Sequence, residues 1–113
     1  MSRRSAAAPR LDAIAPVFAA LGDPTRLRLV AKLSGGAPRS IAQLTEDHAV
    51  TRQAVTKHLR VLEGAGLVRG VRQGRESRFA LQPHALDGAR QALETIARQW
   101  DDALRRLQAF VES

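Results

Sequence analysis

Residues 50–68 constrain this chain more than any other stretch, because they predict one helix with two chemically different sides. Apolar side chains at four- and three-residue spacings place Val55, Leu59 and Leu62 on one face of an α-helix. The opposite side carries cationic or hydrogen-bonding side chains, namely Arg52, Gln53, Thr56, Lys57 and Arg60. We expect the first side to pack and the second to face outward, which is the profile of a helix that reads DNA in the major groove.

Both ends of this helix are also marked in the sequence. Thr51 can cap the start, because its hydroxyl can accept an otherwise unpaired N–H of the first turn. Gly64 or Gly66 supplies the backbone freedom that the chain needs to leave the helix. For His58, within the helix, we expect either packing against another helix or a phosphate contact.

A small β-hairpin is expected directly after this helix, over residues 67–82. Val71 alternates with polar neighbours before a turn at Gln73-Gly74, and Phe79 and Leu81 stand two residues apart after it. Three cationic side chains remain near the tip and on the exposed face: Arg72, Arg75 and Arg78. The pattern predicts a mainly α fold with a small β-hairpin wing, a winged helix-turn-helix whose wing lies along phosphates or the minor groove.

The charge balance supports a nucleic-acid partner. The chain has 18 Lys and Arg against 11 Asp and Glu, a net charge of +7 and a pI near 11.5. That pI exceeds the value of about 9 that suggests a nucleic-acid-binding domain. Between residues 51 and 78, seven cationic and two anionic side chains give a local charge of +5. A solvated basic surface explains the total charge, but it does not explain the concentration on this helix and hairpin.

Three shorter helical segments are expected before this helix. Residues 11–21 place apolar side chains on one broad face, and Gly22 ends that segment. Asp23 can cap the next segment, and Pro24 suits its first position, where the missing N–H would be unpaired anyway. Ser40 can cap a third, short segment. With the helix that follows Thr51, this segment makes a helix-turn-helix over residues 40–65.

The chain is expected to be helical again over residues 84–111. Its apolar side chains are spaced alternately by three and four residues, close to a heptad pattern: Leu86, Ala89, Leu93, Ile96, Trp100, Leu104, Leu107 and Val111. Such a helix spans about 40 Å, more than a small domain covers, so we expect a second copy to cover its apolar face. The expected dimer interface comprises Leu11, Ile14, Phe18, Leu93, Ile96, Trp100, Leu104 and Leu107. Packing within one chain is the alternative, and Trp100 can instead form one wall of a ligand pocket.

Length and composition predict one domain and no enzyme. Residues 11–113 are expected to form a single winged-helix domain for DNA binding and dimerisation, preceded by a flexible basic arm over residues 1–10. No apolar run is long enough to cross a bilayer or to act as a secretory signal, so a cytoplasmic protein is expected. The sequence contains no cysteine, no recognisable nucleophile with its base, and no Gly-rich phosphate loop.

Three stretches resemble the ArsR/SmtB-type family of winged-helix repressors. They are ALGDPTRLRLV at residues 20–30, QAVTKHLRVLEGAGLV at residues 53–68, and Gly74-Arg75 in the hairpin. The resemblance covers nearly the whole domain. It implies a homodimer, built on the first and last helices, that binds an inverted repeat in a bacterial promoter and usually represses its own or an adjacent operon.

The chain departs from the metal-sensing members of that family, which carry a cysteine pair or pairs of His and carboxylates. Without a thiol, sensing of arsenite, cadmium or lead has no chemical basis here. His84 with Asp87, and Asp101 with Asp102, are possible ligands for zinc or nickel, but neither set forms a recognised cluster. We therefore expect no metal and no other cofactor, and leave open an unidentified small-molecule inducer.

The expected DNA-binding side chains come from both helices of the helix-turn-helix and from the wing: Ser40, Thr51, Arg52, Gln53, Thr56, Lys57, His58, Arg60, Arg72, Arg75 and Arg78. The alternative is a module that binds DNA without sequence preference, or that docks RNA or a protein, because a fold does not fix a function. Gln53 and Thr56 argue against it, since a non-specific binder needs only cations on this surface.

Overall fold

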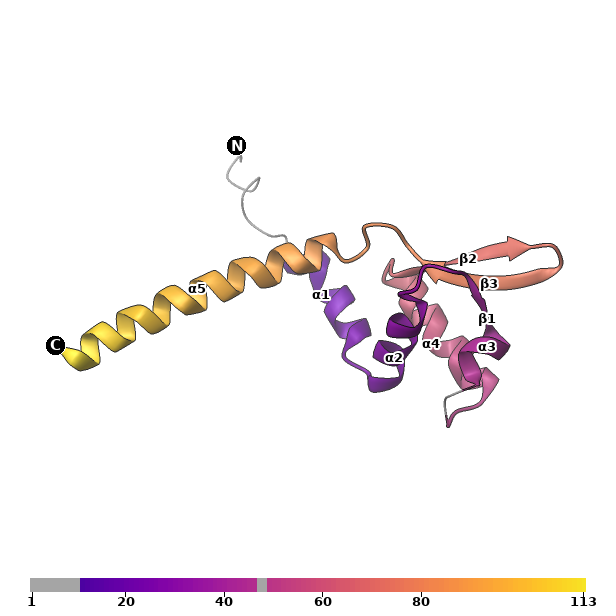
Figure 1. Ribbon diagram of the computed structural model, residues 1–113, viewed down its shortest axis with the longest axis horizontal. Helices are drawn as coiled ribbons and strands as arrows, with labels where there is room; N and C mark the ends of the chain where they lie inside the picture. The colour runs from indigo at the N-terminus through magenta and orange to yellow at the C-terminus, as the bar shows by residue number, and fades with distance from the viewer. Residues whose placement is uncertain (1–10, 47–48) are drawn as a thin grey trace.

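The computed structural model describes residues 11–46 and 49–113, which form five helices and one three-stranded antiparallel sheet (Figure 1). In chain order the elements are α1 (Leu11–Leu21), α2 (Pro24–Leu33), β1 (Arg39–Ser40), α3 (Ile41–Thr45), α4 (Arg52–Gly64), β2 (Val68–Gln73), β3 (Glu76–Leu81) and α5 (Asp87–Glu112). The mainly helical fold with a small β wing is confirmed. The basic arm expected over residues 1–10 lies outside the described residues.

The apolar side of α4 forms the centre of the core, as its spacing predicted. Val55, Leu59 and Leu62 are completely buried. They belong to one cluster with fully buried leucines of the neighbouring helices: Leu29 and Leu33 of α2 and Leu44 of α3. Burial of these side chains sets the rotation of α4 about its own axis and therefore decides which of its residues face solvent.

The wing is a hairpin of β2 and β3 that projects from the body (Figure 1). Gln73 pairs with Glu76, so the turn residues are Gly74 and Arg75, one position later than predicted. Gly74 has φ of 61°, which a two-residue hairpin turn requires at its first position and which glycine adopts without strain.

The sheet contains a third strand that the sequence did not predict. β1 pairs antiparallel with β3, with Arg39 opposite Phe79 and Ser40 opposite Arg78. Two residues are too few to show the alternation that marks a strand, so only the tertiary structure reveals it. β1 ties the base of the wing to the start of α3.

Three helix caps predicted from the sequence are present. Asp23 accepts a hydrogen bond at 3.0 Å from the N–H three residues on, and Thr51 does the same at the start of α4 at 3.0 Å. At α3 the Ser40 hydroxyl accepts from the Gln43 N–H at 3.2 Å, while the Gln43 side chain accepts from the Ser40 N–H at 2.9 Å. This reciprocal pair is a capping box, which helps to explain how a helix of only five residues is held in place.

α5 leaves the body of the protein after its first turns. Ala89 and Ala92 are buried near α1, and a Cβ added at Gly88 would come within 2.6 Å of Ile14 Cδ1. Every residue from Ile96 onward is exposed. The helix has 26 residues, about 39 Å at 1.5 Å per residue, and more than half of it extends beyond α1 (Figure 1).

Replacing Asp23 tests the cap of α2. Asp23→Ala is expected to lower the free energy of unfolding by about 1 kcal/mol, because the first turn loses its side-chain acceptor. Asp23→Asn keeps an acceptor and should cost less. Urea denaturation at neutral pH measures both changes, and an Ala variant as stable as the native chain would contradict the role of the cap.

The same variants should differ in their response to acid. The hydrogen bond from the Arg26 N–H, helped by the Arg26 guanidinium and His58, lowers the pKa of the Asp23 carboxyl below its ordinary value. A depressed pKa in the folded state means that the carboxylate stabilises the protein above the ordinary aspartate range, and that this stability is lost as the pH falls through the folded-state pKa. Denaturation at several acidic pH values should therefore show a shallower loss of stability for Asp23→Asn than for the native chain.

Candidate nucleic-acid interface

The polar side of α4 faces solvent. Arg52, Gln53, Lys57 and Arg60 are exposed, on the side opposite the buried apolar residues of the same helix. Thr56 is half-buried, and its hydroxyl donates to the Arg52 carbonyl at 2.8 Å. Its methyl group and remaining lone pairs are therefore the groups left for any partner.

Ser40 and Thr51 lie at the N-termini of α3 and α4 and differ in exposure. Thr51 is exposed, so the start of α4 is open to solvent. Ser40 is only 7% exposed, and its hydroxyl is held in the capping box. Ser40 therefore holds the start of α3 in place, while Thr51 and the first N–H groups of α4 are available to an anion such as a phosphate.

The three wing arginines have different surroundings. Arg72 and Arg75 are exposed, and Arg75 lies in the turn. Arg78 is half-buried and donates to the Glu76 carboxylate at 2.9 Å and to the Pro38 carbonyl at 3.4 Å. Arg78 thus fastens β3 to the segment that leads into β1, and the exposed charge of the wing belongs to the other two arginines.

A hollow of about 440 Å³ lies between α4 and the wing. Thr56, Arg60 and Glu63 line it from α4, and Arg72 and Ser77 line it from the hairpin. The polar side of α4 and the wing therefore border one concave surface, which has two arginines and one carboxylate among these residues.

His58 lies away from this surface and joins α4 to the start of α2. Its Nδ1 atom is 3.3 Å from Arg26 Nη1 and 3.9 Å from the Asp23 carboxylate. Arg26 also donates from Nε to the Ala20 carbonyl at 2.7 Å. We expected His58 either to pack against another helix or to contact a phosphate. The geometry shows the first of these, a contact with the start of α2.

This cluster of Asp23, Arg26 and His58 was not found by sequence reasoning. Asp23 and Arg26 are close in sequence, and their cap is visible there, but His58 follows 32 residues after Arg26. No local spacing connects the two, so the contact depends on how α2 and α4 pack.

The possible metal ligands do not gather into a site within residues 11–46 and 49–113. No group of three His, Asp or Glu side chains that could hold a metal ion occurs there. His84 and Asp87 form one exposed ion pair at 3.1 Å, and Asp102 pairs with Arg105 along α5. None of the helices in this part of the chain is long and apolar enough to span a membrane.

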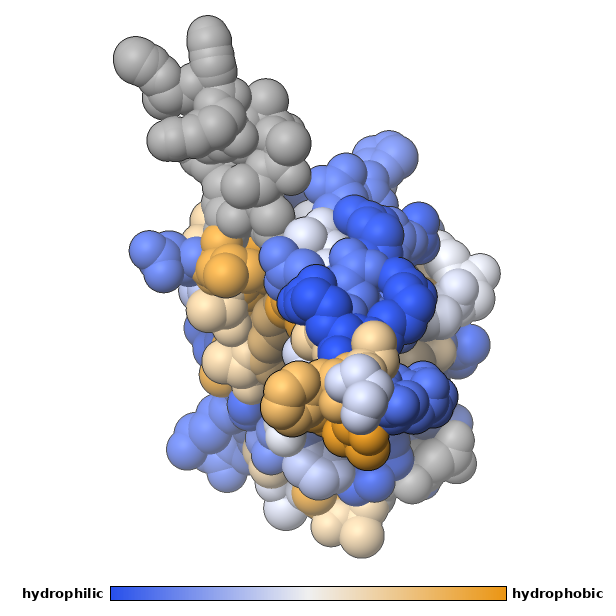
Figure 2. Space-filling model, turned by 90° about the vertical axis from the view of Figure 1, so that its left-hand side faces the viewer, coloured by the Kyte–Doolittle hydropathy of each residue, from blue (hydrophilic) through white to orange (hydrophobic). Residues whose placement is uncertain are grey.

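The residues expected at a dimer interface fall into two groups. Ile14 and Phe18 of α1 are partly buried against the core, whereas Leu11 is exposed. On α5 the large apolar residues from Leu93 onward are all exposed, with Trp100 at 66%. Figure 2, which faces the end where α5 protrudes, shows apolar surface beside strongly polar surface. We call one stripe of α5 residues the α5 seam: Ala89, Leu93, Ile96, Trp100, Leu104, Leu107 and Val111.

Comparison with known proteins gives a consistent result. Residues 21–71 match the family model described as a helix-turn-helix domain. The transcriptional repressor SmtB of Mycobacterium tuberculosis is 35% identical over 94 residues, which are 83% of this chain and 67% of SmtB. The solved structure of an ArsR-like transcriptional regulator from Rhodococcus sp. RHA1 is 37% identical, with a TM-score of 0.72, over 88% of this chain and 92% of that chain.

A more distant structure shares the fold. It is the homodimeric winged helix-turn-helix DNA-binding domain of Mb0332 from Mycobacterium bovis, solved in solution, with 24% identity and a TM-score of 0.64. The match covers 94% of this chain and 93% of that domain. The likeness therefore includes the wing and α5 as well as the helix-turn-helix.

The contacts of Arg26 can be tested by a conservative replacement. Arg26→Lys keeps the charge but loses the planar fork that reaches both the Ala20 carbonyl and His58. We expect the free energy of unfolding to fall by about 1 kcal/mol. Arg28→Lys, at an exposed position of the same helix, is the control and should stay within about 0.5 kcal/mol of the native chain. Equal urea midpoints for the two variants would show that the Arg26 contacts do not stabilise the fold.

Proposed function

The chain belongs to the ArsR/SmtB-type family of winged helix-turn-helix transcriptional regulators, and on this basis we propose that it is a homodimeric repressor that binds an inverted-repeat operator. The observation that carries the proposal is the concave surface between α4 and the wing. Thr56 and Arg60 of α4 and Arg72 of the wing border it together, and Arg52, Gln53 and Lys57 are exposed on the polar side of α4.

The side chains of α4 match the groups that bases present in the major groove. Gln53 pairs with N6 and N7 of adenine, and Arg52 or Lys57 pairs with O6 and N7 of guanine. The Thr56 methyl group meets the methyl group of thymine. Arg60 lines the hollow together with residues of the wing, away from the start of α4. We therefore assign it to a phosphate and not to a base.

The wing supplies affinity without sequence information. Arg72 and Arg75 are exposed and free to approach phosphates or to enter a narrow minor groove. Arg78 is committed to Glu76 and the Pro38 carbonyl, so its contribution is to hold the hairpin at a fixed angle. The phosphate contacts of Arg72 and Arg75 release counterions from the DNA, so the affinity falls as the salt concentration rises.

The homodimer is proposed because the α5 seam is uncovered from Leu93 onward in one copy of the chain. Exposure of so many large apolar side chains along one helix is unfavourable in water. A second copy of the chain, which carries the same apolar stripe, covers them. The fold relative Mb0332 is itself described as homodimeric. A two-fold dimer reads half-sites about 10 to 10.5 base pairs apart, or a multiple of that distance.

Regulation in this protein does not use thiolate chemistry, because the sequence has no cysteine. The chain acts by binding DNA and not by catalysing a reaction. It acts where its operator lies, which in bacteria is the cytoplasm. The regulated genes are its own or an adjacent operon, and an inducer is a small molecule or a protein and not a soft metal.

Two variants separate base reading from backbone binding. Gln53→Ala is expected to reduce the preference for operator over scrambled DNA by about 1 to 3 kcal/mol, because the bidentate contact to adenine is lost. Arg75→Ala should weaken binding to both duplexes equally and reduce the slope of log K against log salt by about 1. Fluorescence anisotropy with DNA from upstream of its own gene, at several salt concentrations, measures both effects.

The native chain provides the reference for that experiment. A preference of about a hundredfold for the upstream DNA, unchanged by EDTA, supports a metal-independent repressor of its own operon. Equal affinity of the native chain for both duplexes would instead favour the non-specific DNA-binding module considered above, or an operator elsewhere, which a genome-wide binding selection resolves.

The dimer is tested by placing charges in the α5 seam. Leu93→Glu with Trp100→Glu is expected to give a monomer by sedimentation and operator binding at least tenfold weaker, because charged side chains cannot be buried unpaired at an interface. Leu27→Glu is the matched control, since Leu27 is 52% exposed but lies on α2. An unaltered dimer in the double variant would rule out the α5 seam as the interface.

A further inference from the structure

The hollow between α4 and the wing contains charged side chains that the rest of the fold does not use. We call it the wing hollow, and its lining includes Ile41, Thr56, Arg60, Glu63, Gly70, Arg72, Ser77 and Phe79. Arg60, Glu63 and Arg72 are exposed. Within residues 11–46 and 49–113, none of these three side chains takes part in an ion pair or a hydrogen bond. Two cations and one anion are therefore available to a bound molecule.

The floor of the wing hollow is apolar, and a glycine leaves it open. Ile41 and Phe79 pack against the core but are only partly buried. Gly70 lies opposite Phe79 across the hairpin, and a Cβ added at Gly70 would meet no other atom within 4 Å. A glycine inside a strand weakens the strand and often marks a place where a ligand approaches closely. The missing side chain leaves open space beside Phe79.

DNA uses only some of the groups in the wing hollow. In the proposed complex the phosphates of a duplex bind Arg60 and Arg72. Phosphates carry the same sign of charge as Glu63, whose ionised carboxylate accepts hydrogen bonds but donates none. Phosphates also gain nothing from an apolar floor. The carboxylate and the floor therefore indicate a second ligand with different chemistry.

We infer that the wing hollow binds an apolar α-amino acid in its zwitterionic form, and that this ligand is an inducer that competes with DNA. The carboxylate of the amino acid binds the guanidinium groups of Arg60 and Arg72, whose paired N–H donors match it. Its ammonium group donates to the Glu63 carboxylate. Its apolar side chain lies over the floor of the hollow, where water is displaced from apolar surface.

The size of the wing hollow suits such a ligand. Its volume of about 440 Å³ lies within the range of small-molecule sites, about 300 to 1,000 Å³. Its lining comes from three elements, α3, α4 and the hairpin, so the two arginines and the carboxylate reach the ligand from different sides. The three charges distinguish a zwitterion from a simple anion or a simple amine.

The regulatory part of the inference rests on the proposed function. A ligand in the wing hollow occupies Arg60 and Arg72, so the duplex loses two phosphate contacts. Because coupling between two ligands is reciprocal, DNA weakens the binding of the amino acid by the same factor. Release of the operator then requires no change in the fold or in the dimer.

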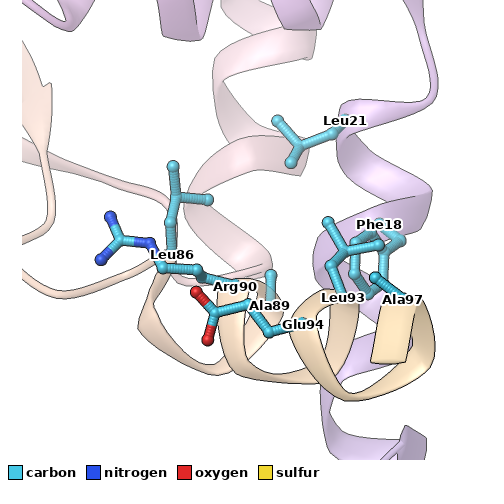
Figure 3. Close-up of a pocket in the computed structure, with 8 residues that line it drawn as sticks. All are labelled: Phe18, Leu21, Leu86, Ala89, Arg90, Leu93, Glu94 and Ala97. Atoms are coloured by element: carbon cyan, nitrogen blue, oxygen red, sulfur yellow. The ribbon is translucent and has the colours of Figure 1, made fainter. Parts of the chain in front are cut away.

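A second hollow, of about 470 Å³ between α1 and α5, is less suitable for a free ligand. Its lining is mostly apolar, with Arg90 and Glu94 of α5 among the lining residues (Figure 3). Leu93 also lines it and belongs to the α5 seam. This hollow therefore borders the interface of the proposed homodimer, whereas the wing hollow lies away from α5 (Figure 1).

Calorimetry on the native chain without DNA tests the ligand. L-Leucine and L-phenylalanine should bind with dissociation constants of about 1 mM or lower. N-acetyl-L-phenylalanine lacks the ammonium group and L-phenylalanine methyl ester lacks the carboxylate, so each should bind at least about fivefold more weakly than L-phenylalanine. No binding of either amino acid up to about 10 mM, or equal binding of the two derivatives, would overturn the inference.

Substitutions in the hairpin test the location of the site. Gly70→Val fills the wing hollow from a strand position that suits valine, and it should weaken the binding of L-phenylalanine at least about tenfold. Gln73→Val is the matched control, because Gln73 is exposed on the same strand, three residues later and therefore on the other face. Its affinity should stay within about twofold of the native value. Native affinity in a folded Gly70→Val variant would place the amino acid elsewhere and overturn the site.

Glu63→Gln tests the same site at an exposed position, where the fold tolerates replacement. It should weaken the binding of L-phenylalanine about fivefold, because the ammonium group loses its ionic partner. It should bind the operator at least as tightly as the native chain, since it removes a negative charge beside the DNA. Unchanged affinity for L-phenylalanine in this variant would show that Glu63 does not hold the ammonium group.

Fluorescence anisotropy with the upstream duplex separates the site from its regulatory role. L-Phenylalanine at about ten times its dissociation constant should weaken operator binding of the native chain about tenfold. Under the same ligand concentration Glu63→Gln should respond less. Binding of the amino acid without loss of operator affinity would overturn its role as an inducer. A native chain that binds the amino acid but prefers no DNA sequence would refute the proposed function and leave the site intact.

Discussion

Burial of one face of α4 is the interaction on which the rest of the structure depends. Val55, Leu59 and Leu62 have no exposed surface and lie in one cluster with leucines of α2 and α3. Because the three side chains fix the rotation of the helix, Gln53 and Lys57 have to face solvent. The exposed polar surface of α4 is thus the consequence of packing on the opposite side, and a change in the core would turn Gln53 and Lys57 away from solvent.

The position of α4 is fixed at a second point, where its polar edge meets the start of α2. Arg26 bonds both the Ala20 carbonyl and His58, and Asp23 caps α2 beside them. A histidine in a basic recognition helix is easily taken for a phosphate ligand. Here its partners are an arginine and a carboxylate of the same chain, so it joins α4 to the start of α2.

α5 differs from the other helices because most of its apolar surface has no neighbour in one copy of the chain. The core of the domain is complete without the second half of this helix, and the residues beyond Thr95 are exposed. In the proposed homodimer, a second copy of the chain stabilises this part of the helix. The helix that pairs the two copies in the proposed homodimer also sets the distance between their two α4 helices.

The sequence by itself determined the helices, their caps, the wing and the polar face of α4, because spacing and capping are local properties that neighbouring residues decide. Only the tertiary structure decided that β1 joins the sheet, that Arg78 bonds the Pro38 carbonyl, and that His58 faces Arg26. Those contacts join segments far apart in the chain, and no local pattern encodes which distant surfaces meet when the core is packed.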